Sequence, residues 1–272
     1  MVEIPESRTI AAQLNEMIKE KSVKKVVANM IPHGCAFFSC DPNFYQEMLL
    51  GKPILYAKDT AGLIEIKIGD VLLLFSDGAQ LRYFYPEDER PKKHQLCVRF
   101  SDDSSIVCTV KLYGGLWAYY ENNVSNEYYK ISKEKPHPLD EGFSFSYFEK
   151  LLYEHKNESI KKAFLQDLIP GLGNGSLQEI LYNAKLNFKT NISSLKEGDI
   201  ERLYFSIKET LLEMCGKCGR DTEYDLFGNR GGYKTKVSKF TYQTPCPRCG
   251  DTITRKTCQG TRVYFCPTCQ KE

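Results

Sequence analysis

The sequence predicts a multidomain α+β protein: a β-rich, sandwich-like N-terminal domain with a flanking helix, a helical domain, and a C-terminal zinc ribbon hairpin. Three observations predict this class. Apolar residues alternate with polar ones in the first half of the chain, the period becomes helical after about residue 140, and two C-x2-C pairs lie near the end. A chain of 272 residues is long enough for about two domains.

The first domain is expected over residues 1–135. Ile10, Leu14 and Ile18 recur at helical spacing after Pro5, which a helix tolerates in its first turn, so a helix is expected over 6–21. Alternating isoleucines at 64–68 lead through a Gly-Asp turn into the apolar run 71–75, which predicts a hairpin. Strands at 96–100 and 106–112 predict a second hairpin. Several strands with one helix against them form a β-rich domain.

The second domain is expected over residues 141–214, after a proline-containing linker at 133–141. A helix is expected over 159–168, followed by a glycine-rich break. Ser176 with Glu179, and Ser194 with Glu197, have the spacing of capping boxes and predict the starts of two further helices. Residues 215–239 are expected to be a connecting loop, and 240–272 the ribbon.

Four cysteines predict the ribbon. Cys246 and Cys249, then Cys266 and Cys269, form two C-x2-C pairs separated by sixteen residues, and a hairpin between the pairs would bring four thiolates around one structural Zn²⁺ per chain. The alternative, a redox dithiol, needs a βαβ context that the sequence lacks.

The remaining cysteines indicate no second metal site. The pair Cys215 and Cys218, even with Cys258, lacks a fourth ligand. The other four are expected to be small buried apolar residues: Cys35, Cys40, Cys97 and Cys108.

The charge distribution favours a polyanionic partner. The net charge is only +2, yet from Leu226 onward nine basic residues face only Asp251 and Glu272. A solvated surface that is basic by chance is the alternative. The odd count of eleven cysteines argues for reduced thiols. The acidic start argues against a signal peptide, and the lack of a long apolar run argues against a membrane span. We therefore expect a cytoplasmic, nucleoid-associated monomer without a membrane partner.

The segment at 169–181 carries a family resemblance. A glycine-rich turn that leads into a helix presents free backbone N–H groups to a phosphate, and Asn174 can donate a further bond. The turn with Gly171, Gly173 and Asn174 resembles that of the helix–two-turn–helix element in the formamidopyrimidine-DNA glycosylase/endonuclease VIII family. The Met-x-Glu-x-Pro-Glu start, the β-rich first half and the final ribbon agree with the family in the same order. The resemblance covers essentially the whole chain.

The resemblance implies a base-excision repair enzyme. In the family, the amine exposed by removal of the initiator Met attacks C1′ of a flipped-out damaged nucleotide, a Schiff base forms, and elimination nicks the strand. Here Val2 would carry the amine, Glu3 would be the acid/base, and Glu6 a supporting carboxylate. Most members begin Met-Pro-Glu, but a primary amine can also form a Schiff base, and a branch of the animal enzymes begins Met-Val-Glu.

The sequence departs from the family around the lesion. A phosphate-binding lysine of the family falls at Ala61 or Gly62, and Lys58 is displaced from that place. The side chains that fill the space of a flipped base are typically Met, Arg and Phe. Asp77 replaces the Met, and Tyr113 and its neighbouring glycine replace the Arg-Phe pair, although Tyr113 can stack on bases.

The arginine of the ribbon is also displaced. The family's phosphate-binding arginine lies five residues before the third ligand cysteine, whereas Arg262 lies four before Cys266. Without a bulge, this shift turns its side chain to the other face of the strand.

The sequence thus favours a DNA glycosylase with AP lyase activity that removes oxidised or damaged bases from duplex or single-stranded DNA. A non-catalytic protein that binds damaged or structured DNA is the first alternative, and an RNA- or translation-associated zinc-ribbon protein the second. The retained Met-x-Glu start favours the enzyme, and the phosphate turn favours DNA.

Overall fold

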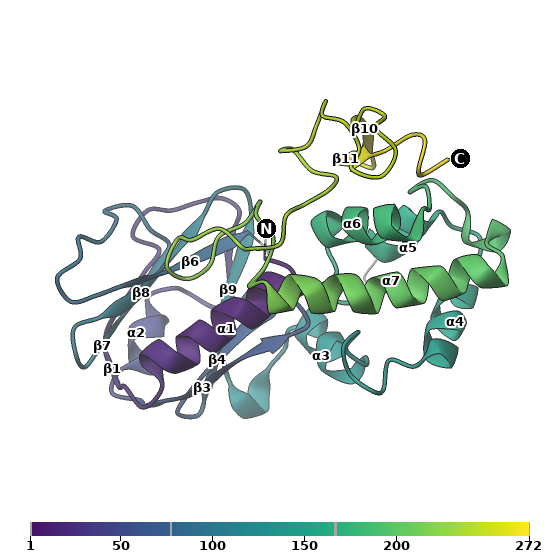
Figure 1. The fold of residues 1–272 in the computed structure, drawn as a ribbon. Helices are drawn as coiled ribbons and strands as arrows, with labels where there is room; N and C mark the ends of the chain where they lie inside the picture. Colours follow the sequence, from purple (N-terminus) through teal and green to yellow (C-terminus); the bar gives the residue numbers. More distant parts are fainter. Residues whose placement is uncertain (1, 77, 166–167, 272) are drawn as a thin grey trace. The chain divides into compact units, whose positions relative to one another are not determined.

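The computed structural model describes residues 2–76, 78–165 and 168–271 and divides the chain into two compact units (Figure 1). The N-terminal unit comprises Met1–Lys130 and Glu223–Arg230. The C-terminal unit comprises Ile131–Thr222 and Gly231–Glu272. The predicted α+β class is confirmed, with strands gathered in the first unit and helices plus a terminal hairpin in the second.

The N-terminal unit is a sandwich of two sheets. One sheet has the order β1-β7-β8-β6 and the other β2-β9-β5-β4-β3. Their bounds are β1 Val23–Ala28, β2 Ala36–Phe38, β3 Ile54–Thr60, β4 Leu63–Ile68, β5 Val71–Phe75, β6 Ala79–Phe84, β7 Leu96–Phe100, β8 Ser105–Val110 and β9 Gly114–Tyr120. Two helices accompany the sheets, α1 at Ile4–Ile18 and α2 at Phe44–Leu49. The apolar faces of both sheets and of α1 share one buried core, which is how the alternating sequence pattern is satisfied.

The predicted hairpins are confirmed as β4–β5 and β7–β8. Their exposure pattern differs from the expected alternation, because every residue of β4 and β5 is buried. A second apolar cluster that includes Leu72 and Tyr129 covers the face opposite the core. Glu65, expected to face water, is buried there and accepts hydrogen bonds from the hydroxyls of Tyr56, Thr60 and Tyr129.

Helix α1 begins two residues earlier than predicted. Its start is fixed at Glu3, whose backbone N–H donates to Glu6 Oε2 at 3.1 Å. This bond pairs one of the donors that a helix N-terminus leaves unsatisfied. The early start places the carboxylates of both residues in the first turn, directly after Val2.

The C-terminal unit contains the helices and the ribbon. Their bounds are α4 Phe145–Glu154, α5 Ile160–Leu165, α6 Asn174–Ala184, η2 Ile192–Ser194 and α7 Glu197–Gly216, with β10 Thr254–Cys258 and β11 Thr261–Phe265 in the hairpin. A short 3-10 helix, η1 at Glu121–Asn123, and α3 at Glu127–Glu134 join the two units along the chain. The predicted linker therefore begins as helix and becomes irregular only after Glu134.

Both predicted capping boxes are wrong. Helix α6 begins at Asn174, so Glu179 lies inside the helix, where its buried carboxylate accepts the backbone N–H groups of Lys236 and Val237. Helix α7 begins after Lys196, whose N–H donates to Asp199 Oδ2 at 3.0 Å. At both places serine and glutamate have the spacing of a capping box by chance. The residue at which a helix starts also depends on where the preceding turn ends.

Part of the expected loop 215–239 packs on the N-terminal unit. Leu226 is buried in the sandwich core, its N–H donates to Gln13 Oε1 at 3.0 Å, and its carbonyl accepts the N–H of Tyr83 at 3.0 Å.

The domain bounds 1–135, 141–214, 215–239 and 240–272 stay predictions. Across the described part of the chain, no helix combines the length and the apolar character needed to cross a bilayer.

Candidate functional site

The start of the chain brings the three predicted catalytic residues together. Val2 is half-buried against the sandwich core, while Glu3 and Glu6 are 3% and 4% exposed. The backbone of Glu3 is held at both ends, by the Glu6 carboxylate at its N–H and by the Ser7 N–H at its carbonyl (2.9 Å). The residue after Val2 therefore presents a buried carboxylate on a fixed backbone.

The turn between β3 and β4 anchors this start. Asp59 Oδ1 accepts the Ser7 hydroxyl at 2.5 Å and the Gly62 N–H at 3.0 Å. Asp59 was missed by sequence reasoning, although an aspartate shortly before a glycine turn is a usable signal. Ala61 and Gly62, where the family's lysine was expected, form the turn with φ of 46° and 83°.

Lys58 does not replace that lysine. Its Nζ lies 3.3 Å from the buried Glu65 carboxylate, on the strand paired with β3. The cation therefore has a partner within its own sheet.

Two loops of the N-terminal unit meet at Gly78 and Tyr113. A Cβ added at Gly78, which has φ +84°, would lie 1.7 Å from the Tyr113 carbonyl oxygen, so only glycine allows this approach. Ser76 also joins these two loops, because its hydroxyl accepts the Gly115 N–H at 2.7 Å. Tyr113 is 47% exposed on this paired platform. Asp77, the residue expected in place of the family's Met, lies outside the described residues.

The glycine turn of the C-terminal unit leads directly into α6. Gly171 has φ +77°, and Gly173 is the N-cap residue with an extended backbone. Asn174 is the first helical residue, and its Nδ2 donates to the Arg262 carbonyl at 3.1 Å. The turn and the ribbon are therefore in direct contact, across 88 residues of sequence.

The four predicted ligand cysteines converge on one point. Their sulfur atoms all lie within 4.8 Å of one another, with Cys249 and Cys266 at 3.4 Å and Cys246 and Cys269 at 3.9 Å. A tetrahedral metal with bonds of about 2.3 Å would place thiolates about 3.8 Å apart, so the donor set fits such an ion. Among residues 2–76, 78–165 and 168–271 this is the one such cluster, and Cys215, Cys218 and Cys258 form no second one.

Hydrogen bonds favour a thiolate in this cluster. Burial disfavours the charged form of Cys246, but the Tyr182 hydroxyl and the N–H groups of Arg248 and Cys249 lower its pKa to about 6. The sulfur that the Tyr182 hydroxyl contacts at 3.3 Å is therefore already suited to a cation.

Arg262 lies on a regular strand. Strand β11 pairs with β10 without a register shift, and Arg262 lies opposite Thr257. No bulge therefore turns the Arg262 side chain back to the face of the strand expected for the family's phosphate-binding arginine. Its side chain is exposed, whereas its neighbour Val263 is buried. Thr261 occupies the family's position, and its hydroxyl accepts a bond from the buried Lys161 at 2.6 Å.

Lys161 was missed by sequence reasoning. Its Nζ also donates to the Cys258 carbonyl at 2.5 Å, so it holds the tip of the ribbon hairpin. Burial lowers the pKa of this ammonium. A lysine inside an apolar helix gave no signal beyond its helical position.

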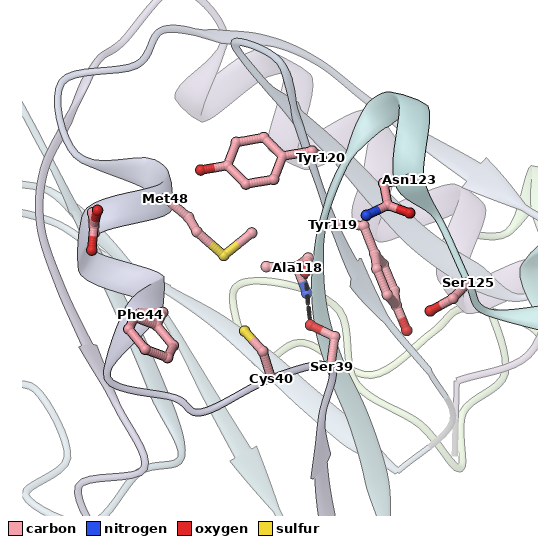
Figure 2. Close-up of a pocket in the computed structure, with 10 residues that line it drawn as sticks. Ser39, Cys40, Phe44, Met48, Ala118, Tyr119, Tyr120, Asn123 and Ser125 are labelled. Atoms are coloured by element: carbon pink, nitrogen blue, oxygen red, sulfur yellow. Dashed lines mark hydrogen bonds between the residues drawn. The ribbon is translucent and has the colours of Figure 1, made fainter.

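A cavity of about 460 Å³ opens in the N-terminal unit beside α2 and the end of β9 (Figure 2). Phe44, Met48 and Tyr120 surround it, and Cys40 lies at its edge. None of the predicted site residues lines it. Cys35 and Cys40 are exposed, which corrects their predicted burial, since both lie in loops flanking the short β2.

Known proteins resemble this chain in sequence. Residues 135–222 match the family described as the formamidopyrimidine-DNA glycosylase H2TH domain. The formamidopyrimidine-DNA glycosylase of Listeria monocytogenes is 25% identical over 283 residues, covering 100% of both chains, and that of Heliobacterium modesticaldum is 28% identical over 292 residues with the same coverage.

Solved structures agree over the whole chain. A complex of the Lactococcus lactis enzyme with DNA containing an abasic site has a TM-score of 0.83 at 26% identity, and covers 99% of this chain and 100% of its own. The chain therefore resembles formamidopyrimidine-DNA glycosylases over its length, and residues 135–222 carry the H2TH domain of that family. The family's H2TH domain accordingly contains α4 to α7, and its zinc-finger position is occupied by the four-cysteine cluster.

Proposed function

We propose that this protein is a DNA glycosylase with AP lyase activity, acting through a Schiff base on the N-terminal amine of Val2. The observation that carries the proposal is the buried carboxylate of Glu3, on a fixed backbone directly after Val2. An α-amine has a pKa of about 7.7–8.0, much closer to neutrality than a lysine side chain at about 10.4, so it can act as a nucleophile once Met1 is removed.

The proposed reaction uses the residues in sequence. The lone pair of the Val2 nitrogen forms a bond to C1′ while the bond from C1′ to the base breaks, and the base leaves with that electron pair and a proton. Glu3 carries protons to the opening sugar ring and away from the amine, which gives the imine. Loss of a proton from C2′ then expels the 3′ phosphate and nicks the strand. Glu6 holds the Glu3 backbone at 3.1 Å throughout.

The C-terminal unit supplies the proposed phosphate contacts. The N-terminus of α6, entered through Gly171 and Gly173, presents backbone N–H groups to an anion. An amide nitrogen carries two hydrogens, so Asn174 can bind a phosphate oxygen while it donates to the Arg262 carbonyl. Arg262, whose backbone carbonyl accepts the Asn174 bond, adds an exposed positive charge on β11.

We infer that the four-cysteine cluster holds one structural Zn²⁺ per chain. Four thiolates in a closed tetrahedral set are the donors of structural zinc rather than of a catalytic ion with an open position. The metal would maintain the ribbon, and no step of the proposed reaction passes through it.

We propose damaged or abasic DNA as the substrate, consistent with the abasic-site DNA in the Lactococcus lactis complex. Tyr113 and its neighbour Leu112, which is 71% exposed, are the proposed side chains that enter the stack when a nucleotide flips out. An apolar pair of this kind also suits single-stranded DNA, where bases stack on aromatic rings. The proposed place of action is the nucleoid, and one chain suffices.

A binding protein without catalysis is the second candidate. It is favoured by the tight turn at Ala61 and Gly62, which leaves no lysine at the family's phosphate contact, and by the pairing of Lys58 with Glu65. Such a protein would retain the turn, Arg262 and the ribbon, and would bind an abasic site without reacting.

Borohydride trapping separates the two candidates. A trimmed protein that begins at Val2 and a protein with an uncleaved N-terminal tag are mixed with duplex and single-stranded DNA carrying an abasic site. The trimmed protein should bind and form a covalent adduct. The tagged protein should bind but form none, because its Val2 nitrogen is an amide. Intact-mass measurement verifies that Met1 is gone.

Two results would refute the catalytic assignment. Binding by the trimmed protein without an adduct would establish the binding protein instead. An equal adduct from the tagged protein would show that another amine reacts.

A further inference from the structure

The cavity beside α2 forms where two strands of the five-stranded sheet separate. Strand β2 pairs with β9 over only three residues, and after Phe38 the chain leaves the sheet for α2. The Ser39 hydroxyl then takes the place of a strand, because it donates to the Ala118 carbonyl of β9 at 2.7 Å. Space remains between α2 and the end of β9. Its volume of about 460 Å³ lies within the range of about 300–1,000 Å³ that is usual for small-ligand sites.

One face of α2 forms a wall of this cavity. Phe44, Glu47 and Met48 are spaced i, i+3, i+4, so they lie on one side of the helix, and all three line the cavity. Figure 2 shows Phe44, Met48 and Tyr120 gathered around the same opening, with Cys40 beside them. Phe44 and Tyr120 are 55% and 47% exposed, whereas Met48 is 8% exposed. The thioether therefore lies at the base of the cavity and the two rings at its mouth.

The charge of the cavity is negative. Glu47 is the only charged side chain among the described residues that line it. Within the part of the chain that the structure describes, the Glu47 carboxylate has no hydrogen-bond or ion-pair partner. Lys52 lies close by, with its Nζ 5.1 Å from the centroid of the Tyr120 ring, but it pairs with Asp70 at 2.6 Å and does not line the cavity. An unpaired carboxylate disfavours an anion here and favours a cation.

The two aromatic rings favour a cation as well. The face of an aromatic ring attracts positive charge because its π electrons make that face negative. Tyr120 already has the ammonium of Lys52 over its ring, which shows that the ring is open to such a contact. Phe44 adds a second exposed ring at the same mouth. Two rings and a carboxylate together can surround a positive group.

The available hydrogen-bond acceptors indicate the type of cation. An unsubstituted ammonium has three N–H donors that need acceptors. On the α2 side of the cavity the main acceptor is the Glu47 carboxylate, because the Ser39 hydroxyl is bonded to Ala118 and the Cys40 thiol accepts only weakly. A fully alkylated ammonium needs no acceptor and contacts aromatic rings through its methyl groups.

We propose that this cavity binds a small organic cation with an alkylated ammonium group. The group would lie against the rings of Phe44 and Tyr120, above the Met48 thioether, with Glu47 as its counter-charge. Neither Val2 nor any other residue of the proposed reaction lines the cavity, so binding of the cation does not depend on the DNA chemistry.

The test uses choline as the probe and 3,3-dimethyl-1-butanol, which has the same shape without the charge, as its control. Each is titrated into the zinc-loaded protein at constant ionic strength while iodoacetamide alkylates exposed thiols. Peptide mass spectrometry measures the rate at Cys40, and Cys35, which is exposed but outside the cavity, is the reference in the same chain. Choline should slow alkylation of Cys40 about threefold or more and leave Cys35 unchanged. The alcohol should need about tenfold higher concentrations for the same protection.

Variants at the mouth of the cavity test the roles of charge and ring. Glu47→Gln should raise the half-protecting concentration of choline about tenfold and leave that of the alcohol unchanged, because only the charge is lost. Phe44→Leu keeps an apolar side chain without the ring and should raise the concentration of choline about threefold. Both side chains are exposed, so the fold should tolerate these changes. Glu16→Gln and Tyr85→Leu, at exposed positions outside the cavity, are the controls and should have no effect.

Three outcomes would overturn the inference. Equal protection by the alcohol would show a cavity without preference for charge. An unchanged choline concentration in Glu47→Gln would remove the counter-charge. Absence of protection would show that there is no site, provided that isothermal titration calorimetry also detects no binding of choline; a heat of binding that is lost in Glu47→Gln would support the site even if Cys40 stays reactive.

Discussion

At the scale of single residues, the carboxylates at the start of α1 are buried in the N-terminal unit. Glu3 and Glu6 are almost without solvent contact, and the Glu3 backbone N–H donates a hydrogen bond to the Glu6 carboxylate. A buried carboxylate costs free energy unless hydrogen bonds compensate it, and buried ionisable groups of this kind are common at functional sites. Burial therefore distinguishes the Glu3 carboxylate from the exposed carboxylates on the same helix.

Replacement of Glu3 by Gln should leave DNA binding unchanged and slow base release about 10²- to 10⁴-fold, because the amide cannot carry a proton. Single-turnover release of the base from a damaged duplex measures the rate. Glu16→Gln, at an exposed position of α1, is the matched control and should have no effect. Equal rates in the Glu3 and Glu16 variants would contradict the proton-carrying role.

Asn174 has two partners to lose in the proposed complex, a phosphate and the Arg262 carbonyl. Asn174→Ala should therefore weaken binding by about 1–3 kcal/mol on all DNA sequences alike. Affinities for several abasic duplexes of unrelated sequence check this. A loss confined to one sequence would show that Asn174 reads bases rather than phosphates.

At the scale of elements, the ribbon is held by its four-cysteine cluster and by α6 and α5. The sulfur cluster closes the two knuckles, the side chains of Asn174, Gln178 and Tyr182 hold β11 and Cys246, and Lys161 holds the hairpin tip. The hairpin itself has only two strands, and an isolated two-stranded hairpin is marginally stable in water. Its order therefore depends on these attachments.

Cys249→Ser should abolish stoichiometric zinc and weaken DNA binding, because three thiolates cannot complete the closed tetrahedral site. Metal analysis of the purified protein and DNA titration measure both effects. Cys258→Ser is the control on the same hairpin, since Cys258 lies outside the cluster, and it should retain about one zinc. Full zinc and full binding in Cys249→Ser would contradict the ligand assignment.

At the scale of the whole molecule, the charge is divided unevenly along the chain. Overall, 37 basic residues oppose 35 acidic ones, but the part from Leu226 onward is strongly basic. Within the C-terminal unit, Arg262, which is one of these basic residues, is exposed, and the N-terminus of α6 adds a partial positive charge. Phosphates rather than bases are the expected targets of such a surface.

DNA affinity should accordingly fall steeply as salt increases, because each neutralised phosphate releases counterions. Titration of an abasic duplex between about 50 and 200 mM salt should show a loss of about 10³-fold or more if six phosphates are contacted. A nearly flat dependence would show that apolar or base contacts dominate binding instead.

Local patterns predicted much of the fold. The hairpins β4–β5 and β7–β8, helix α6 and the ribbon strands follow from period and turn residues within about fifteen positions of one another. The ligand cysteines and the glycine turn follow from spacing alone. The capping boxes failed because Ser176 and Glu179 both lie inside α6, and because Ser194 lies two residues before the N-cap residue of α7.

Tertiary structure decided which of these local features meet. The burial of Glu65 and Glu179, the packing of Leu226 into the sandwich, and the bond between Asn174 and Arg262 all join residues of distant segments. Nothing in the periodicity of one segment specifies which surface of another will cover it. The sequence by itself determined the ribbon, the phosphate turn and the Val2–Glu3 start, because their chemistry is local. Only the packing of α6 against β11 determined where Arg262 lies, because that position depends on side chains 88 residues apart.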